Sequence, residues 1–124
     1  MFASDDVKYL SERAKQLGKD IRGANATDIA ASYQYLALAG QSVGEMYQTI
    51  EPYTKAAIAY GEDQKRVTDL GTDSMSALRL ETEKTSYYLN VLTKAQNKSN
   101  TTATQLMEAY IACGGTLANM NVPI

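Results

Sequence analysis

Apolar side chains recur along this chain with the alternating three- and four-residue spacing of amphipathic helices. The clearest run, at Val7, Leu10, Ala14, Leu17 and Ile21, forms a heptad seam. Ser4 can cap free amide groups before this run, and the acidic residues after it suit the positive end of a helix. We therefore predict a first helix over about residues 5–22, ended by Gly23 and Asn25.

A second apolar stripe starts after the capping residues Thr27 and Asp28 and continues to about residue 70, with Pro52 in its middle. Its members are Ile29, Tyr33, Leu36, Val43, Tyr47, Ile50, Tyr53, Ala57, Tyr60, Val67 and Leu70. Pro52 lacks an amide donor, so Thr49 could cap a new helix with Pro52 in its first turn. Alternatively, one long helix bends at Pro52 and continues. The phase of the stripe is roughly preserved across the proline, which favours the bend.

Two glycines are candidate helix ends further along the chain. Gly61 weakens a helix but does not by itself end one. Gly71 is the stronger break, because it can adopt the left-handed conformation and Thr72 or Asp73 can cap the next helix. The same small residues also occur inside long helices where packing requires them. The pattern resumes at Met75 and should stop in the polar stretch 97–102.

The last apolar run, "ATQLMEAYIAC", predicts a short helix that Gly114 and Gly115 end, and then an extended tail over 115–124. No linker divides the chain, so we predict a single helical domain over 1–124. The predicted fold class is all-α: an antiparallel bundle of long helices with a proline-bent central helix and coiled-coil-like packing. The composition agrees, because alanine is abundant, tryptophan is absent and phenylalanine occurs once.

Candidate chemistry is sparse. The chain has no histidine, which removes the commonest general base and the commonest neutral metal ligand. Cys113 is the single cysteine, and we expect it to be a buried structural thiol. Carboxylate pairs such as Asp69 with Asp73 are expected on solvated faces. We therefore expect no enzyme, no metal site, no cofactor and no small-molecule substrate.

The charge pattern bounds the partners. The net charge is −2 and the acidic and basic residues are interspersed, which disfavours nucleic acid binding. No run of 18 apolar residues is present, and the charged start of the chain does not resemble a signal peptide. These features favour a cytoplasmic location without a membrane span.

Two sets of residues are candidate contact sites. Tyrosines are enriched at protein interfaces, although they also fill helix-helix contacts; the candidates are Tyr47, Tyr53, Tyr60, Tyr87, Tyr88 and Tyr110. Exposure of both Tyr87 and Tyr88 would favour an interface, because adjacent residues cannot face one seam. The predicted first helix carries the densest positive charge, and Arg13, Lys15, Lys19 and Arg22 can partly share a face that would contact an acidic partner or membrane surface.

The stretches "YLSERAKQLGKDI" and "YLALAGQSVGEMYQTIEPYTKAAIAY" carry spaced leucines and glycines, a proline bend and a further helix after it. In this pattern the region from Val7 to about Lys98 resembles the first part of a sorting-nexin-type BAR domain. The resemblance implies an elongated, curved helical dimer that senses or bends membranes.

These patterns are compatible with three functions. The first is a non-enzymatic helical interaction or assembly module that oligomerises through its heptad-like apolar faces or binds another helical protein. The second is a BAR-like dimer that binds membranes. The third is a subunit of a surface or secreted helical filament, in which the apolar end Val122-Pro123-Ile124 packs on neighbours.

Overall fold

The computed structural model describes residues 3–119, which fold into six α-helices and one short 3-10 helix, with no strand in this range. The helices are α1 (Ser4–Asp20), α2 (Ala26–Leu38), α3 (Val43–Tyr60), α4 (Gln64–Ala77), η1 (Thr82–Lys84), α5 (Thr85–Asn97) and α6 (Ala103–Asn119). The predicted all-α bundle is confirmed, although its helices are shorter and more numerous than expected.

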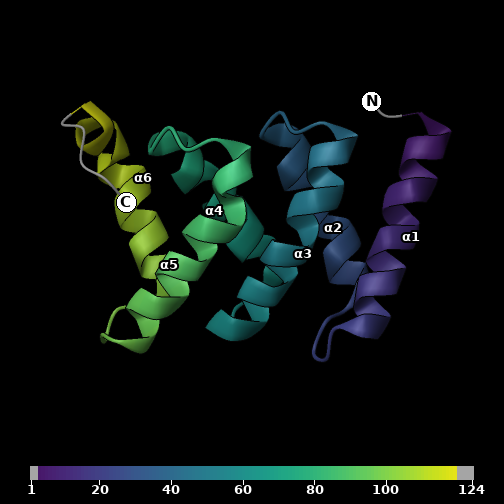
Figure 1. Cartoon of the computed structure of the whole chain (residues 1–124), viewed down its shortest axis with the longest axis horizontal. Coiled ribbons are helices and arrows are strands. Elements are labelled where there is room, and N and C mark those ends of the chain that lie inside the picture. The colour runs from purple at the N-terminus through teal and green to yellow at the C-terminus, as the bar shows by residue number, and fades with distance from the viewer. Residues whose placement is uncertain (1–2, 120–124) are drawn as a thin grey trace.

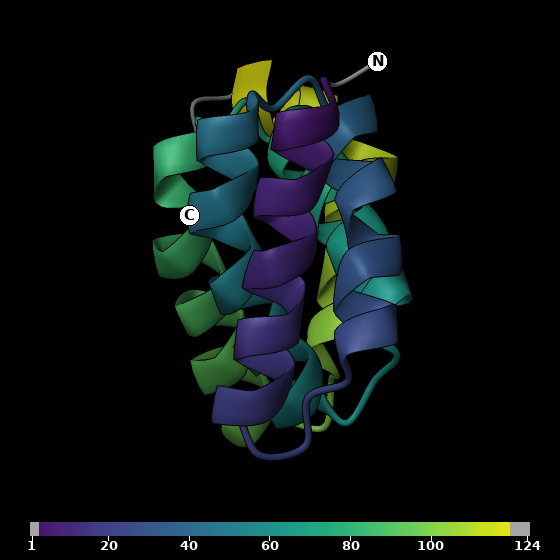
Figure 2. The same ribbon diagram turned by 90° about the vertical axis from the view of Figure 1, so that its right-hand side faces the viewer.

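The helices stand side by side in two layers. Each helix runs antiparallel to the next, so the connections alternate between the two ends of the row (Figure 1). In one layer α1 packs on α3 and α3 on α5, and in the other α2 packs on α4 and α4 on α6. A view along the row from the α1 end shows α1 in front, flanked by α3 on the left and α2 on the right (Figure 2). The plan is that of stacked helical hairpins, in which each hairpin packs mainly on its neighbours.

The first helical hairpin agrees with the predicted heptad seam. Leu10, Ala14 and Leu17 are buried, which confirms the middle of the seam. The Tyr33 hydroxyl of α2 donates a hydrogen bond to the Leu10 carbonyl of α1 at 2.8 Å. At the other end of the pair, a Cβ on Gly18 would lie 3.0 Å from the Ala26 Cβ, so the two helices approach closely there.

The expected long central helix is divided before it reaches Pro52. Helix α2 ends at Leu38, and Gly40 takes a positive φ of 84° in the connection. The Ser42 hydroxyl accepts from the Glu45 amide while the Glu45 carboxylate accepts from the Ser42 amide, and this capping box starts α3. Pro52 lies inside α3, so it does not begin a helix. The helix therefore continues across Pro52, as the favoured alternative predicted, but only from Val43 to Tyr60. The single helical path from residue 29 to 70 was wrong, because the start signal at Ser42 and the end signal at Gly61 divide it.

Of the two candidate glycine breaks, Gly61 ends a helix and Gly71 does not. Gly61 ends α3 in the left-handed conformation, with φ 68° and ψ 32°, and the Glu62 amide donates to the Ala57 carbonyl. Gly71 lies buried inside α4, where an added Cβ would overlap the ring of Tyr53. The break predicted at Gly71 was therefore wrong, because packing against Tyr53 requires its missing side chain.

In the second half of the chain, both the break after α4 and the end of the last helix come later in the sequence than predicted. Helix α4 continues to Ala77, and the turn after it places Arg79 at a φ of 59°. The polar stretch after Asn97 separates α5 from α6, as predicted. Helix α6 passes through Gly114 and Gly115 to Asn119, so the tail predicted from residue 115 was wrong over 115–119. The rest of that tail, with Val122-Pro123-Ile124, lies outside the described residues.

Buried hydroxyl groups accompany the apolar core. The largest fully buried side chains include Tyr53, Tyr88, Ile29, Leu36, Met46, Ile50, Leu92 and Met107. Thr54, Thr68 and Thr72 each donate a hydrogen bond to the carbonyl four residues earlier, which satisfies their hydroxyls without a second helix. The core therefore holds these small polar residues without leaving their hydroxyls unpaired.

Candidate interaction surfaces

Three of the candidate interface tyrosines are core residues in this fold. Tyr53 and Tyr88 are fully buried, and Tyr60 is 8% exposed. The Tyr60 hydroxyl donates to the Leu89 carbonyl at 2.8 Å, and the Tyr88 hydroxyl donates to Ser74 Oγ at 2.6 Å. Burial raises the pKa of all three phenols, that of Tyr60 to about 12. Their side chains therefore join α3, α4 and α5 within the chain.

The other candidate tyrosines are at least partly accessible. Tyr110 is half-buried with its ring 6.5 Å from that of Tyr88, whereas Tyr87 is exposed and lies near the Lys84 ammonium. Tyr47 is half-buried and stacks on the exposed Tyr9, with ring centroids 4.8 Å apart. Because Tyr88 is buried and only Tyr87 is exposed, this pair lacks the double exposure that would favour an interface.

The structure separates Arg13 from the other basic candidates of α1. The Arg13 guanidinium lies 4.2 Å from the Tyr47 ring centroid and pairs with the Glu51 carboxylate of α3 at 3.0 Å. Its side chain is 17% exposed. Glu51 also pairs with Lys55, and the hydrogen bond from Lys55 is the main cause that lowers the Glu51 pKa. Arg13 therefore fastens α1 to α3 and does not face solvent with the lysines.

Four exposed cations form a separate stripe along α1 and just beyond it. We define the basic stripe as Lys8, Lys15, Lys19 and Arg22, all of which are exposed. Lys8 and Lys15 are seven residues apart, so they lie on one face of α1, whereas Arg22 follows the extended residue Ile21 beyond the end of the helix. None of the four makes an ion pair with a described residue. Lys8 adds to the dense positive charge of the predicted first helix but was left out of the predicted contact set, although its seven-residue spacing from Lys15 was the signal that could have placed it there.

A shallow groove runs beside this stripe between α1 and α2, and Met46 of α3 contributes to its floor. It has a volume of about 280 Å³ and is lined by Val7, Leu10, Ser11, Ala30, Tyr33, Gln34, Ala37 and Met46. Val7 and Ala30 are exposed, while Leu10, Tyr33 and Met46 form a buried floor. No other described helix covers this side of the α1–α2 pair, which is the end of the row seen in Figure 2.

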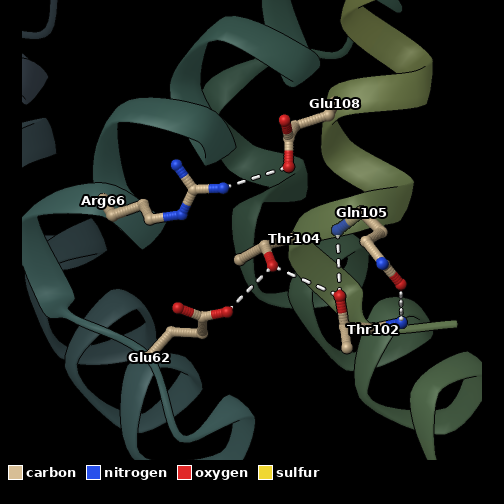
Figure 3. Close-up of polar contacts among 6 residues, drawn as sticks. All are labelled: Glu62, Arg66, Thr102, Thr104, Gln105 and Glu108. Atoms are coloured by element: carbon tan, nitrogen blue, oxygen red, sulfur yellow. Dashed lines mark hydrogen bonds and ion pairs between the residues drawn. The ribbon is translucent and has the colours of Figure 1, made fainter.

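At the opposite end of the row, polar side chains join α4 to α6 (Figure 3). The Arg66 guanidinium pairs with the Glu108 carboxylate at 3.0 Å. Thr102 and Gln105 cap the start of α6 reciprocally, and the Thr104 hydroxyl donates to the Glu62 carboxylate at 3.1 Å. These groups find partners within the chain, so the cluster serves to fix the position of α6.

The candidate reactive groups lie on different helices: Asp69 and Asp73 are on α4, and Cys113 is on α6. No group of three or more Cys, Asp or Glu residues that could hold a metal ion occurs among the described residues. Burial, and then the nearby Asp69 charge, raise the pKa of Asp73, but both carboxylates are on the exposed side of α4. Cys113 is exposed, so its predicted burial was wrong; its thiol lies 3.0 Å from the Ala109 carbonyl.

Hydropathy gives no sign of a membrane span: among the described helices, none combines the length and apolar character needed to cross a bilayer.

Comparison with known proteins identifies a family. The profile of the family described as phage-related minor tail protein matches residues 11–124. No curated protein and no solved structure matches the chain. The resemblance to a sorting-nexin BAR domain was therefore wrong. Its spaced leucines, glycines and proline are features of many packed helices, and here they build helices of 13 to 18 residues, the longest being α3.

Proposed function

The chain belongs to the family of phage-related minor tail proteins, and we propose that it is a structural component that assembles with other tail proteins by helix packing. The family match over residues 11–124 is the observation that carries this proposal. In this role the chain acts through its shape and outer surface, without catalysis, cofactor or small-molecule substrate.

The distribution of apolar side chains supports an assembly role. Val7, Tyr9, Leu38, Ile58, Tyr87 and Ile111 are all substantially exposed, and Leu38 is 83% exposed at the end of α2. Exposed apolar groups on a helical surface are the usual anchors for a neighbouring helix. The buried hydroxyl groups of the core, by contrast, are hydrogen-bonded within the chain, which suits a scaffold more than a reactive centre.

Self-association is a second candidate, and the two ends of the row favour it. Val7 on α1 and Ile111 on α6 are exposed at opposite ends, so copies could stack end to end in an open, filament-like series. Light scattering over a range of concentrations tests this candidate. A mass that rises with concentration supports stacking, and a constant monomer mass contradicts it.

The proposed function is tested in a phage or prophage that encodes this chain. An early stop codon in its gene should give particles with absent or malformed tails by negative-stain electron microscopy. Supplying the chain in trans should restore normal tails, and an antibody against the chain should label tails of the restored particles. Normal, infectious tails that lack the chain would overturn the proposal.

A further inference from the structure

The groove between α1 and α2 combines an apolar floor with charge on one rim only. Ser11 lines the groove, and Lys8 and Lys15 lie three residues before and four residues after it on α1, so both are its helical neighbours. Lys19 and Arg22 extend the same basic stripe. The opposite rim on α2 carries Ala30 and Gln34 and no charge.

The groove is held open by fixed contacts. Near Gly18 and Ala26 the two helices nearly touch, whereas the groove lies at the other end of the pair, between Val7 and Ala37. The hydrogen bond from Tyr33 to the Leu10 carbonyl ties the floor together, and burial raises the Tyr33 pKa so that this hydroxyl keeps its proton. The groove therefore occupies the end of the α1–α2 pair that lies away from this close approach, over a floor that the Tyr33 hydrogen bond holds together.

The packing within the chain indicates what shape fits this groove. Helices of the second layer pack in series, with α4 on α2 and α6 on α4. The groove lies on the other side of α2, at the position where a preceding helix of the same layer would pack. Its α2 rim is built from short side chains such as Ala30 and Ala37, which let a helix come close and insert a bulky apolar side chain.

We propose that this groove docks an amphipathic helix of another tail protein, with bulky apolar residues against Val7 and Ala30 and acidic residues along the basic stripe. The inference rests on the proposed function for the identity of the partner as a tail protein. Lys8 and Lys15 are seven residues apart on α1, so a helix that runs alongside α1 meets them with Asp or Glu at the same repeat. Arg13 is not part of this contact, because its guanidinium already pairs with Glu51 and covers the Tyr47 ring.

The experiment uses the full chain and three designed helical peptides of about 18 residues, or about five turns. The first has a leucine stripe flanked by glutamate, the second replaces the glutamates by lysines, and the third keeps the glutamates but replaces the leucines by alanines. NMR chemical-shift perturbation locates the binding surface, and fluorescence titration measures affinity at low and high salt.

The first peptide should bind more tightly than the other two and should shift the amide signals of Val7, Ser11, Ala30 and Gln34. The double variant Lys8→Glu with Lys15→Glu should lose about tenfold or more in affinity for it and gain affinity for the lysine peptide. The matched control, Lys94→Glu with Lys98→Glu at the exposed end of α5, should bind like the native chain. Circular dichroism establishes that each variant is folded.

Four results would overturn the proposal. The first is the absence of chemical-shift changes at the groove when peptide is added, and the second is peptide affinity that does not change when Lys8 and Lys15 are replaced by glutamate. The third is chemical-shift changes at the groove that appear without peptide as the chain concentration rises. The fourth is binding to anionic vesicles and to none of the peptides. The third would assign the groove to a second copy of the chain, and the fourth to a membrane. Failure of the groove proposal can be distinguished from failure of the proposed function. If the chain is found in tails but its groove binds no acidic helix, only the groove proposal is rejected.

Discussion

At the scale of single residues, the fold depends on where a side chain is missing as much as on where one is present. Gly71 in α4 faces the Tyr53 ring, and both residues are buried. A methyl group added at Gly71 has no room unless the ring or the α3–α4 contact shifts. Overpacking of this kind typically costs about 1–3 kcal/mol.

We predict that Gly71→Ala lowers the free energy of unfolding by about 1–3 kcal/mol, measured by urea denaturation. The matched control is Gly44→Ala in the first turn of α3, where the nearest atom to an added Cβ is Ser42 Oγ at 4.0 Å. This control should raise the free energy of unfolding by about 0.5 kcal/mol, because it restricts the unfolded chain without strain. Equal effects of the two substitutions would contradict the packing assigned to Gly71.

The buried phenols predict how stability depends on alkaline pH. Burial raises the pKa of Tyr60 from 10.0 to about 12, so the unfolded chain loses this proton at a lower pH than the folded chain. The contribution of Tyr60 is therefore complete below pH 10 and is lost as the pH rises from 10 through about 12. The pKa values of Tyr33, Tyr53 and Tyr88 are shifted in the same direction by burial.

The measurement is urea denaturation at a series of pH values, with tyrosinate absorbance monitored in parallel. The free energy of unfolding should fall above pH 10, and Tyr60→Phe should make that fall shallower. The same variant loses the hydrogen bond to the Leu89 carbonyl, so it should be less stable at neutral pH by about 1 kcal/mol. Ionisation of all nine tyrosines near pH 10 in the folded chain would contradict this account.

At the scale of elements, the attachment of α1 to α3 depends on Arg13. Its guanidinium covers the Tyr47 ring and pairs with Glu51, and Tyr47 in turn stacks on Tyr9. Arg13→Ala should lower the free energy of unfolding by about 1–2 kcal/mol, because a cation–π contact, an ion pair and packed methylene groups are lost together.

Lys15→Ala, on the exposed side of the same helix, is the control for this substitution. It should change stability by less than about 0.5 kcal/mol, as surface substitutions usually do. Thermal denaturation monitored by circular dichroism compares the two variants directly. If Arg13→Ala proves as mild as Lys15→Ala, the α1–α3 cluster does not stabilise the fold.

The elements also show where sequence reasoning reaches its limit. The heptad seam of α1 and the polar stretch before α6 were predictable, because local spacing and solvation determine them. The roles of Gly61 and Gly71 were not, since only the position of Tyr53 makes a side chain intolerable at Gly71. Similarly, Arg13 and Lys15 are both cations on the same predicted helix, and only the neighbouring α3 separates the buried cation from the exposed ones.

At the scale of the whole molecule, the two-layer arrangement has no signature in the sequence. No internal repeat of useful length is visible, so the stacking of α2, α4 and α6 could not be read from periodicity. The order of the layers depends on long-range contacts such as that of Gly114 with Ala77, where an added Cβ would lie 2.7 Å from the Ala77 Cβ. In the sequence Gly114 looks like a helix end, whereas in the fold it is a point of close contact between α6 and α4.

This arrangement predicts that stability is uneven along the row. Helix α4 packs against α2, α3, α5 and α6, whereas the main contacts of α1 are with α2 and α3 and those of α6 are with α4 and α5. In stacked helical proteins the terminal elements have neighbours on one side only and open at a lower free energy. Native-state hydrogen exchange should therefore give the strongest protection in α3 and α4 and weaker protection in α1 and α6.

The groove proposal extends this prediction to the bound chain. The glutamate-flanked peptide should raise protection in α1 and α2 more than in α5 and α6, because it covers only the first end of the row. A peptide without the leucine stripe is the control and should leave the exchange rates unchanged. Uniform protection of all six helices in the free chain would mean that the row opens as one cooperative unit. A partner bound at one end would then have no weaker end helices to stabilise.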